Sequence, residues 1–216
     1  MNMLTGGAFM GITIGHFDLK TDDLDRTAWL FYVTDLGIMR MFFGKEKQAV
    51  PLLKKLILLN YNHFSHNYII CARQNGEIVG ILAGFDGKMN RLVERECGQE
   101  YFRSLGLLKA LRAGLVALFM QWLFKNSVAD DEFYVNNLCV APGNRNLGVG
   151  AMLLGEIFRK YDKVSLGVNA NNHRGLKFYE RNGFKVESGH KINILGKTLG
   201  AYNMMWNRKD NCCGSG

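Results

Sequence analysis

Proline is scarce in this 216-residue chain, which has two, and no repeat or low-complexity tract marks a linker. The most apolar stretch covers residues 113–124, whereas a membrane-spanning helix needs about 20 apolar residues. The first basic residue is Lys20, so the amino terminus lacks the charged start of a secretory signal. These absences predict one cytoplasmic domain over residues 1–210 with no membrane contact, followed by a frayed tail at 211–216.

Disulfide and metal-site patterns are also missing. The five cysteines are an odd number without metal-type spacing, which predicts reduced thiols and no metal. His63 and His66 have the spacing of metal ligands. No third ligand stands near them in the sequence, so we expect a pair in a surface loop.

Positive charge is plentiful and unevenly spread. The chain carries a net charge of +8, and residues 141–191 hold nine Lys and Arg against four Asp and Glu. Such a segment fits a nucleic-acid surface, a pocket for a multiply phosphorylated cofactor, or a solvated face. No arginine-rich run or interleaved aromatic pattern favours nucleic acid, so no nucleic-acid partner is predicted.

The first half of the chain predicts a strand, helices and a hairpin. A strand over 11–19 precedes a helix over 21–33, with Thr21 as its N-cap. Further helix is expected over 34–60, with interruptions near Gly44 and Pro51. Two β-rich runs over 67–85 flank Asn75-Gly76, the preferred residues of a tight hairpin turn.

The second half alternates strands with helices. Helices are expected over 88–96 and, after Gly98, over 99–124. A strand over 132–140, a helix over 151–161, a strand over 163–168 and a helix over 174–182 follow, and a hairpin of 184–195 with 198–206 closes the chain. This order predicts an α/β fold with a mixed, mostly antiparallel sheet, one parallel strand pair and helices on both faces.

The loop after the strand at 132–140 is rich in turn-forming residues, and Gly148 and Gly150 open the next helix. Unpaired amides at a helix start, approached through glycines, suit phosphate or pyrophosphate. A P-loop would need Gly-Lys-Ser/Thr, which is absent, and a dinucleotide fingerprint would need glycine where Leu153 stands. The alternative is a turn that only packs a helix against the sheet.

Two segments together resemble the acetyl-CoA site of the GNAT superfamily of N-acetyltransferases. The first is Arg-x-x-Gly-x-Gly at 145–150, with Pro142 three residues before the arginine. The second combines Leu-x-Val, an asparagine, Tyr-Glu and Gly-Phe, met by Leu166, Val168, Asn172, Tyr179, Glu180, Gly183 and Phe184. Gly175 departs from the family, where alanine is usual.

The resemblance implies acetyl-CoA as cosubstrate, a GNAT-type acyl-CoA N-acyltransferase fold, and a parallel strand pair that splays to admit the pantetheine arm. Amides of residues 146–151 would hold the pyrophosphate, and Asn172 would contact the arm or order the neighbouring backbone. The implied cofactor-binding residues are Leu138, Cys139, Val140, Arg145, Asn146, Leu147, Gly148, Val149, Gly150, Ala151 and Asn172. Cys139 itself reads as a small buried side chain rather than a nucleophile.

By the same resemblance, Tyr179 is the general acid that protonates the departing thiolate. The base that takes the amine proton is Glu132 or ordered water. The acceptor is a small-molecule or peptide amine, within a monomer or homodimer, and the helical segment 88–124 could wall its pocket. A non-catalytic acyl-CoA-binding or sensing domain of the same fold is the alternative reading.

Overall fold

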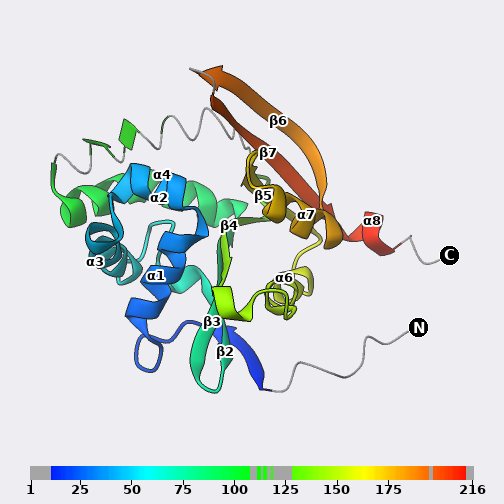
Figure 1. The fold of residues 1–216 in the computed structure, drawn as a ribbon, viewed down its shortest axis with the longest axis horizontal. Coiled ribbons are helices and arrows are strands. Elements are labelled where there is room, and N and C mark those ends of the chain that lie inside the picture. Colours follow the sequence, from blue (N-terminus) through cyan, green and yellow to red (C-terminus); the bar gives the residue numbers. More distant parts are fainter. Residues whose placement is uncertain are drawn as a thin grey trace.

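A seven-stranded sheet forms the centre of the molecule (Figure 1). The computed structural model describes residues 11–107, 111, 112, 114, 115, 118, 128–194 and 197–212. The strands lie in the order β1-β2-β3-β4-β5-β7-β6. Their bounds are β1 Ile12–His16, β2 Ile69–Gln74, β3 Glu77–Asp86, β4 Glu132–Val140, β5 Lys163–Asn169, β6 Lys185–Ile194 and β7 Lys197–Asn207.

One parallel pair interrupts an otherwise antiparallel sheet, as predicted. Strands β4 and β5 are parallel, and every other neighbouring pair is antiparallel. The pairing of β4 with β5 runs from Glu132–Lys163 to Val135–Leu166. Both strands continue beyond it, β4 to Val140 and β5 to Asn169. The two strands therefore separate at their carboxyl ends, which confirms the predicted splay.

A β-bulge in β4 lies at the start of this separation. The register of β3 with β4 shifts between Ala83, which faces Asn137, and Gly84, which faces Val135. Asn136 is thus the extra residue, and its amide donates to Asn137 Oδ1 (2.7 Å) and to the His63 carbonyl (3.2 Å). A bulge leaves a residue unpaired and bends its strand.

Helices cover both faces of the sheet, as predicted (Figure 1). One apolar cluster joins α1 (Leu24–Thr34), α2 (Leu36–Phe43) and α3 (Glu46–Ile57) to the sheet face that carries Cys139. The other joins α6 (Val149–Phe158) and α7 (His173–Arg181) to the opposite face. Leu138 and Val140 pack on that second cluster, so successive side chains of β4 point to opposite layers.

The first helices differ in detail from the prediction. Helix α1 begins after Asp23, whose carboxylate accepts from the Arg26 amide (3.0 Å), and not at Thr21. Threonine and aspartate both cap helices well. Asp22, which lies between Thr21 and Asp23, is bound by Arg73 instead. Gly44 ends α2 with φ +88°, as expected. Pro51, however, lies inside α3, which starts five residues earlier at Glu46.

The segment after the first hairpin also differs. One helix, α4 (Gly87–Leu105), replaces the expected break at Gly98, and it ends at Gly106 with φ +76°. Glu100 anchors this helix, because its carboxylate accepts from the Asn60 and Tyr61 amides and from the Asn62 side chain. These contacts offset the cost of about 1 kcal/mol for a helical glycine.

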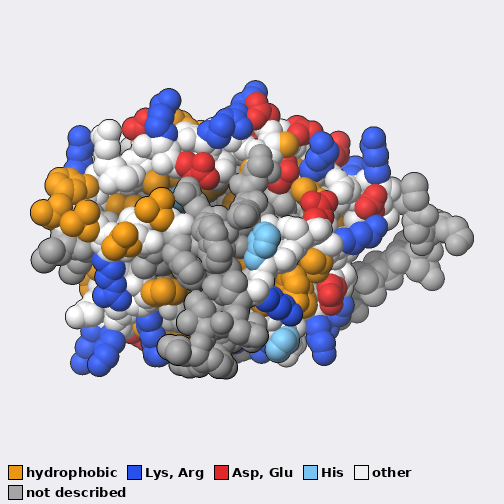
Figure 2. Space-filling model, turned by 90° about the horizontal axis from the view of Figure 1, so that it is seen from above, with side chains coloured by type: hydrophobic (Ala, Val, Ile, Leu, Met, Phe, Trp, Pro, Cys, Tyr) orange, Lys and Arg blue, Asp and Glu red, His pale blue; other side chains and the backbone are white. Residues whose placement is uncertain are grey.

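Part of the expected helix over 99–124 lies outside the described residues. Its described leucines are exposed, Leu115 by 70% and Leu118 by 65%. Figure 2 shows apolar side chains gathered at the end of the molecule where α4 and this segment lie. Arg112 donates to the carbonyls of Met41 and Arg40, at the end of α2. These leucines therefore do not point into the core.

The last described element is a short helix, α8 (Arg208–Cys212). Asn211 donates to the carbonyls of Asn207 (2.9 Å) and Gly183 (3.4 Å). Residues 211 and 212 therefore belong to a helix tied to the end of α7, and not to a frayed tail. Residues 213–216 and the turn at 195–196 lie outside the described residues.

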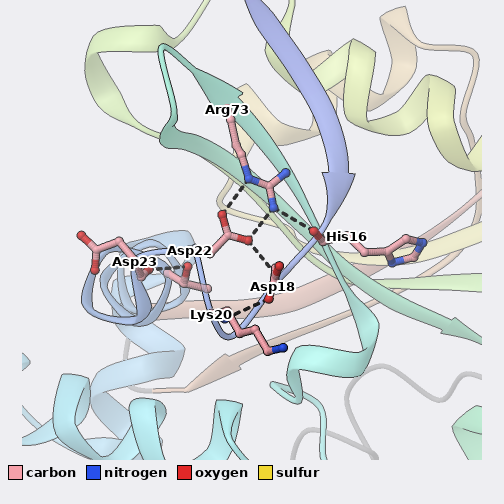
Figure 3. A network of polar contacts seen from close by, with 7 residues as sticks. His16, Asp18, Lys20, Asp22, Asp23 and Arg73 are labelled. Atoms are coloured by element: carbon pink, nitrogen blue, oxygen red, sulfur yellow. Dashed lines mark hydrogen bonds and ion pairs between the residues drawn. The ribbon is translucent and has the colours of Figure 1, made fainter.

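A buried ion pair fixes the connection from β1 to α1 (Figure 3). Arg73 on β2 donates to both carboxylate oxygens of Asp22, at 2.7 and 2.5 Å, and to the His16 carbonyl at 2.8 Å. The Asp18 amide donates to the same carboxylate at 2.7 Å. Burial alone would raise the pKa of Asp22, but hydrogen bonds from Arg73 and Asp18 hold it below its usual value.

Candidate functional site

The loop after β4 presents backbone amides at the start of α6. A short 3-10 turn, η2 (Pro142–Asn144), leads into Asn146 with φ +65° and Gly148 with φ +79°. Gly148 occupies the N-cap of α6 without any side-chain capping bond. The positive φ values suit Asn and Gly. A helix start with uncapped amides is the geometry that binds a phosphate.

Two arginines brace this loop. Arg145 donates from Nε to the Val140 carbonyl (3.0 Å), which closes the loop onto the end of β4. Arg174 on α7 donates to Asn146 Oδ1 (3.1 Å). The two segments that carry the family resemblance therefore touch in space, although Asn146 and Arg174 are 28 residues apart.

Gly150 allows α6 and α7 to pack closely. A Cβ atom at this position would lie 2.9 Å from Phe178 Cζ on α7, which is closer than two carbon atoms approach. Val149 and Gly150 are buried, whereas Leu147 and Ala151 are exposed. Gly150 is therefore required for packing, and Gly148 for the backbone conformation.

Asn172 caps α7 and explains the departure at Gly175. Its side chain accepts from the Gly175 amide (2.9 Å). A Cβ at Gly175 would lie 2.6 Å from Asn172 Nδ2, so the capping side chain fills the space that alanine would need. The capping role supports the part of the prediction in which Asn172 orders the neighbouring backbone.

A basic groove runs along α7 beside this loop. It has a volume of about 690 Å³ and is lined by His173, Arg174, Lys177, Glu180 and Arg181. Arg174 thus faces both the groove and the loop. The concentration of positive charge expected from the sequence is therefore found next to the candidate phosphate site.

Tyr179 lies on the face of α7 that packs against the sheet. It is half-buried between the rings of Phe178 (centroids 5.1 Å apart) and Phe184 (5.5 Å). Burial raises its pKa well above 10, and the nearby Tyr134 hydroxyl and Cys139 thiol raise it further. Both neighbours are on β4, so Tyr179 lies close to the strand whose end leaves β5. Its hydroxyl keeps its proton at neutral pH.

Cys139 is 4% exposed, as expected of a small core residue. Burial raises the pKa of its thiol, although the Thr34 hydroxyl and Arg145 partly oppose the shift. A thiol with a raised pKa is a poor nucleophile at neutral pH.

Glu132 lies at the other end of β4. It is 5% exposed, and its two carboxylate oxygens accept from the Ser165 hydroxyl and from the Ala129 amide (3.4 Å). It pairs with Lys163 in the closed part of the β4–β5 ladder. The structure therefore does not bring Glu132 together with the residues around the strand separation.

Two polar residues that the sequence analysis missed lie at the separation itself. Asn169, the last residue of β5, donates to Asp35 Oδ2 (3.4 Å) at the junction of α1 and α2. Thr34, the residue before Asp35, lies close enough to the Cys139 thiol on β4 to lower its pKa. The only sequence signal was the position of Asp35 between two helical stretches.

The two histidines of the His-x-x-His stretch do not form a surface pair. His66 Nδ1 lies 2.8 Å from the Ile57 carbonyl. The His63 ring packs against Phe85, with centroids 5.9 Å apart, and burial lowers its pKa to about 4. Within the described part of the chain, no group of three His, Cys, Asp or Glu side chains is placed to hold a metal ion.

The helices of the described residues include none that is long and apolar enough to cross a membrane. Cys71, Cys97 and Cys139 are free thiols.

The sequence and the fold both resemble known acetyltransferases. Residues 110–186 match a family model for the acetyltransferase (GNAT) domain. No curated protein matches the sequence. A crystal structure of an acetyltransferase has a TM-score of 0.63 and 19% identity, covering 90% of this chain and 98% of that one. An N-acetyltransferase from Staphylococcus aureus Mu50 has a TM-score of 0.58 and 17% identity, covering 86% and 97%.

An acetyltransferase of the GNAT family from Streptococcus pneumoniae has a TM-score of 0.50 and 15% identity, covering 91% of this chain and 98% of that one. The fold is thus that of the acetyltransferases. The matched domain and this fold together support a GNAT superfamily acetyltransferase.

Proposed function

We propose that the protein transfers an acetyl group from acetyl-CoA to a primary amine by direct attack, without a covalent enzyme intermediate. One observation carries the proposal. The parallel strands β4 and β5 part after Val135 and Leu166, between the uncapped start of α6 and the protonated Tyr179. The site thus combines a place for phosphates, an opening for a narrow chain and a proton donor.

The residues present fit acetyl-CoA. Amides of residues 146–151 would hold the pyrophosphate, and the cations of the α7 groove would neutralise further phosphate charge. The edge of β4 that faces away from β3, beyond its last pair with β5 at Val135, would pair with the amides of the pantetheine arm. Acetyl-CoA supplies an activated thioester when it is bound.

The chain's own chemistry is proton transfer and positioning. When the amine nitrogen forms its bond to the carbonyl carbon and the carbon–sulfur bond breaks, Tyr179 gives its proton to the leaving thiolate. The phenol is a weaker acid than a thiol, whose pKa is about 8.5, so Tyr179 keeps its proton until the thiolate departs. The amine proton passes to water, which returns a proton to the Tyr179 phenolate. Glu132 stays a hypothesis as base, since Ser165 and Ala129 engage its carboxylate.

A second candidate function is non-catalytic binding of an acyl-CoA. The engaged carboxylate of Glu132 favours it, because the base expected from the sequence is then bound by Ser165 and Ala129. The position of Tyr179 beside β4 argues against non-catalytic binding.

The test is titration with acetyl-CoA followed by measurement of free thiol with a panel of amines. Transfer predicts saturable binding and thiol release that requires an amine. Binding without amine-dependent release would support the sensing function, and absence of binding would contradict both.

A further inference from the structure

The junction of α1 and α2 touches both strands of the separating pair. Thr34 lies beside the Cys139 thiol on β4, and Asp35 accepts from Asn169 on β5. Cys139 and Asn169 both lie beyond the last β4–β5 pair. Residues 34 and 35 therefore span the opening between the strands.

This junction lies on the face opposite the candidate phosphate site. Helix α1 packs with Cys139 in one apolar cluster, whereas α6 packs with Leu138 and Val140 in the other. A cosubstrate held at the start of α6 would thus enter the opening from the α6 face. The acceptor must then reach the thioester from the α1–α2 face, where Asp35 stands.

The Asp35 carboxylate has acceptor capacity to spare. Oδ1 caps α2 by accepting from the Ile38 amide (3.1 Å), and Oδ2 accepts the 3.4 Å bond from Asn169. An ionised carboxylate offers about four acceptor positions. Asp35 is partly exposed, and the ion pairs among the described residues do not include it.

The Asn169 side chain is oriented toward this carboxylate. Its Oδ1 accepts from the Asn171 amide (3.0 Å), which leaves Nδ2 to donate to Asp35. The carboxylate is therefore held at the end of β5 by a neutral donor rather than by a cation. A negative charge positioned in this way lacks the partner that partly buried charges usually have.

We infer that Asp35 binds the positively charged ammonium group of the acceptor and so selects amines without a neighbouring carboxylate. The inference rests on the proposed transferase function and names its substrate class. The ammonium group has hydrogens to donate to the unused acceptor positions of Asp35. An amino acid would place its own carboxylate beside Asp35 and be repelled. The bound ammonium group gives one proton to water to become the attacking amine, and the nitrogen loses a second proton to water as the amide forms, so Asp35 takes up neither proton.

The test compares phenethylamine with phenylalanine, which share a skeleton and differ by one carboxylate. For the wild-type protein, kcat/KM should be higher for phenethylamine. Asp35→Asn should lower that preference about tenfold, as expected for one charge pair a few ångströms apart at a partly exposed site. The effect should appear in the KM of the amine, with the affinity for acetyl-CoA unchanged.

Asp35→Asn keeps a capping oxygen, because Asn and Asp cap helices about equally well. Asp23→Asn is the matched control, since Asp23 caps α1 in the same way, by accepting from Arg26 (3.0 Å). If Asp35→Asn does not fold, Asp35→Ser is measured in its place, because serine is also a good helix cap. Thermal unfolding confirms the fold of each variant.

The outcomes separate the two claims. A reduced preference in Asp35→Asn, but not in Asp23→Asn, supports the inference. Amine-dependent turnover with an unchanged preference overturns the role of Asp35 and leaves the transferase standing. Acetyl-CoA binding without turnover on any amine overturns the transferase, and the inference with it.

Discussion

The Arg174 guanidinium on α7 donates to Asn146 Oδ1 in the loop before α6, at 3.1 Å. This bond joins the candidate pyrophosphate site to the basic groove of about 690 Å³ along α7. Coenzyme A carries a 3′-phosphate as well as a pyrophosphate. The position of Arg174 therefore suits contact with this second phosphate group.

Replacing Arg174 by Gln should reduce discrimination between acetyl-CoA and its 3′-dephospho analogue. A charge-assisted hydrogen bond contributes about 1.5–3 kcal/mol, so the ratio of kcat/KM values should fall roughly tenfold or more. Arg159→Gln is the control, because Arg159 is paired with Glu156 on α6. Equal ratios for wild type and Arg174→Gln would place the 3′-phosphate elsewhere.

Adding a methyl group at Gly150 should weaken both stability and turnover. The new Cβ would lie 2.9 Å from Phe178 Cζ, and overpacking of this kind costs about 1–3 kcal/mol. Movement of Phe178 would shift the adjoining Tyr179. Denaturant unfolding and thiol-release kinetics measure the two effects.

Gly155→Ala, on the same helix, is the matched control. Apart from the backbone of its own helix, no atom lies within 4 Å of the added Cβ, so the free energy of unfolding should rise by about 0.5–1 kcal/mol. If both alanine variants behave alike, the close approach of α6 to α7 is not what requires glycine.

Replacing Glu132 by Gln should lower stability more than it lowers kcat. The buried carboxylate accepts from Ser165 and Ala129, and weakening such bonds costs about 1–3 kcal/mol. Thermal unfolding and turnover per folded molecule distinguish the roles. A loss of kcat of about 100-fold or more in a stable variant would instead identify Glu132 as the base.

The Asp22–Arg73 pair should make stability depend on acid pH. Because the pKa of Asp22 is lowered in the folded state, the pair stabilises the fold above the unfolded pKa, and this stabilisation is lost as pH falls through the folded pKa. Asp22→Asn should lower the free energy of unfolding by about 2 kcal/mol at pH 7. The difference from wild type should vanish as pH falls well below 3.8, the ordinary pKa of Asp.

Asp25→Asn provides the comparison, since the side chain of Asp25 is 70% exposed in its pair with Lys54. Exposed pairs contribute about 0–1 kcal/mol. Equal destabilisation by the two substitutions would contradict the importance assigned to the buried pair.

Much of the sheet could be predicted because its signals are local. Alternating apolar residues, the Asn75-Gly76 turn and the glycines that open α6 each specify backbone within a few residues. The helix starts were less certain, because Thr21, Asp22 and Asp23 are all suitable caps. The choice depends on Arg73, which holds Asp22 from β2. Similarly, Gly98 was expected to break a helix that Glu100 anchors to a distant loop.

Part of the candidate site could likewise be predicted from local sequence, and part could not. The candidate phosphate loop and Tyr179 lie in two contiguous segments, so their resemblance to a family could be recognised. The contact of Asp35 with Asn169 joins residues 134 positions apart. No local pattern records it, since it exists only because α1 crosses the end of the parallel pair.

Transfer of an isotopically labelled acetyl group from acetyl-CoA to an amine, by wild type and by Tyr179→Phe, tests the central claim most directly. The account predicts label on the amine in equal amount to the thiol released, with no label on the protein. Tyr179→Phe should bind acetyl-CoA equally well and transfer the label about 100-fold or more slowly. Label on the protein, or equal rates for the two proteins, would contradict direct transfer with Tyr179 as the acid.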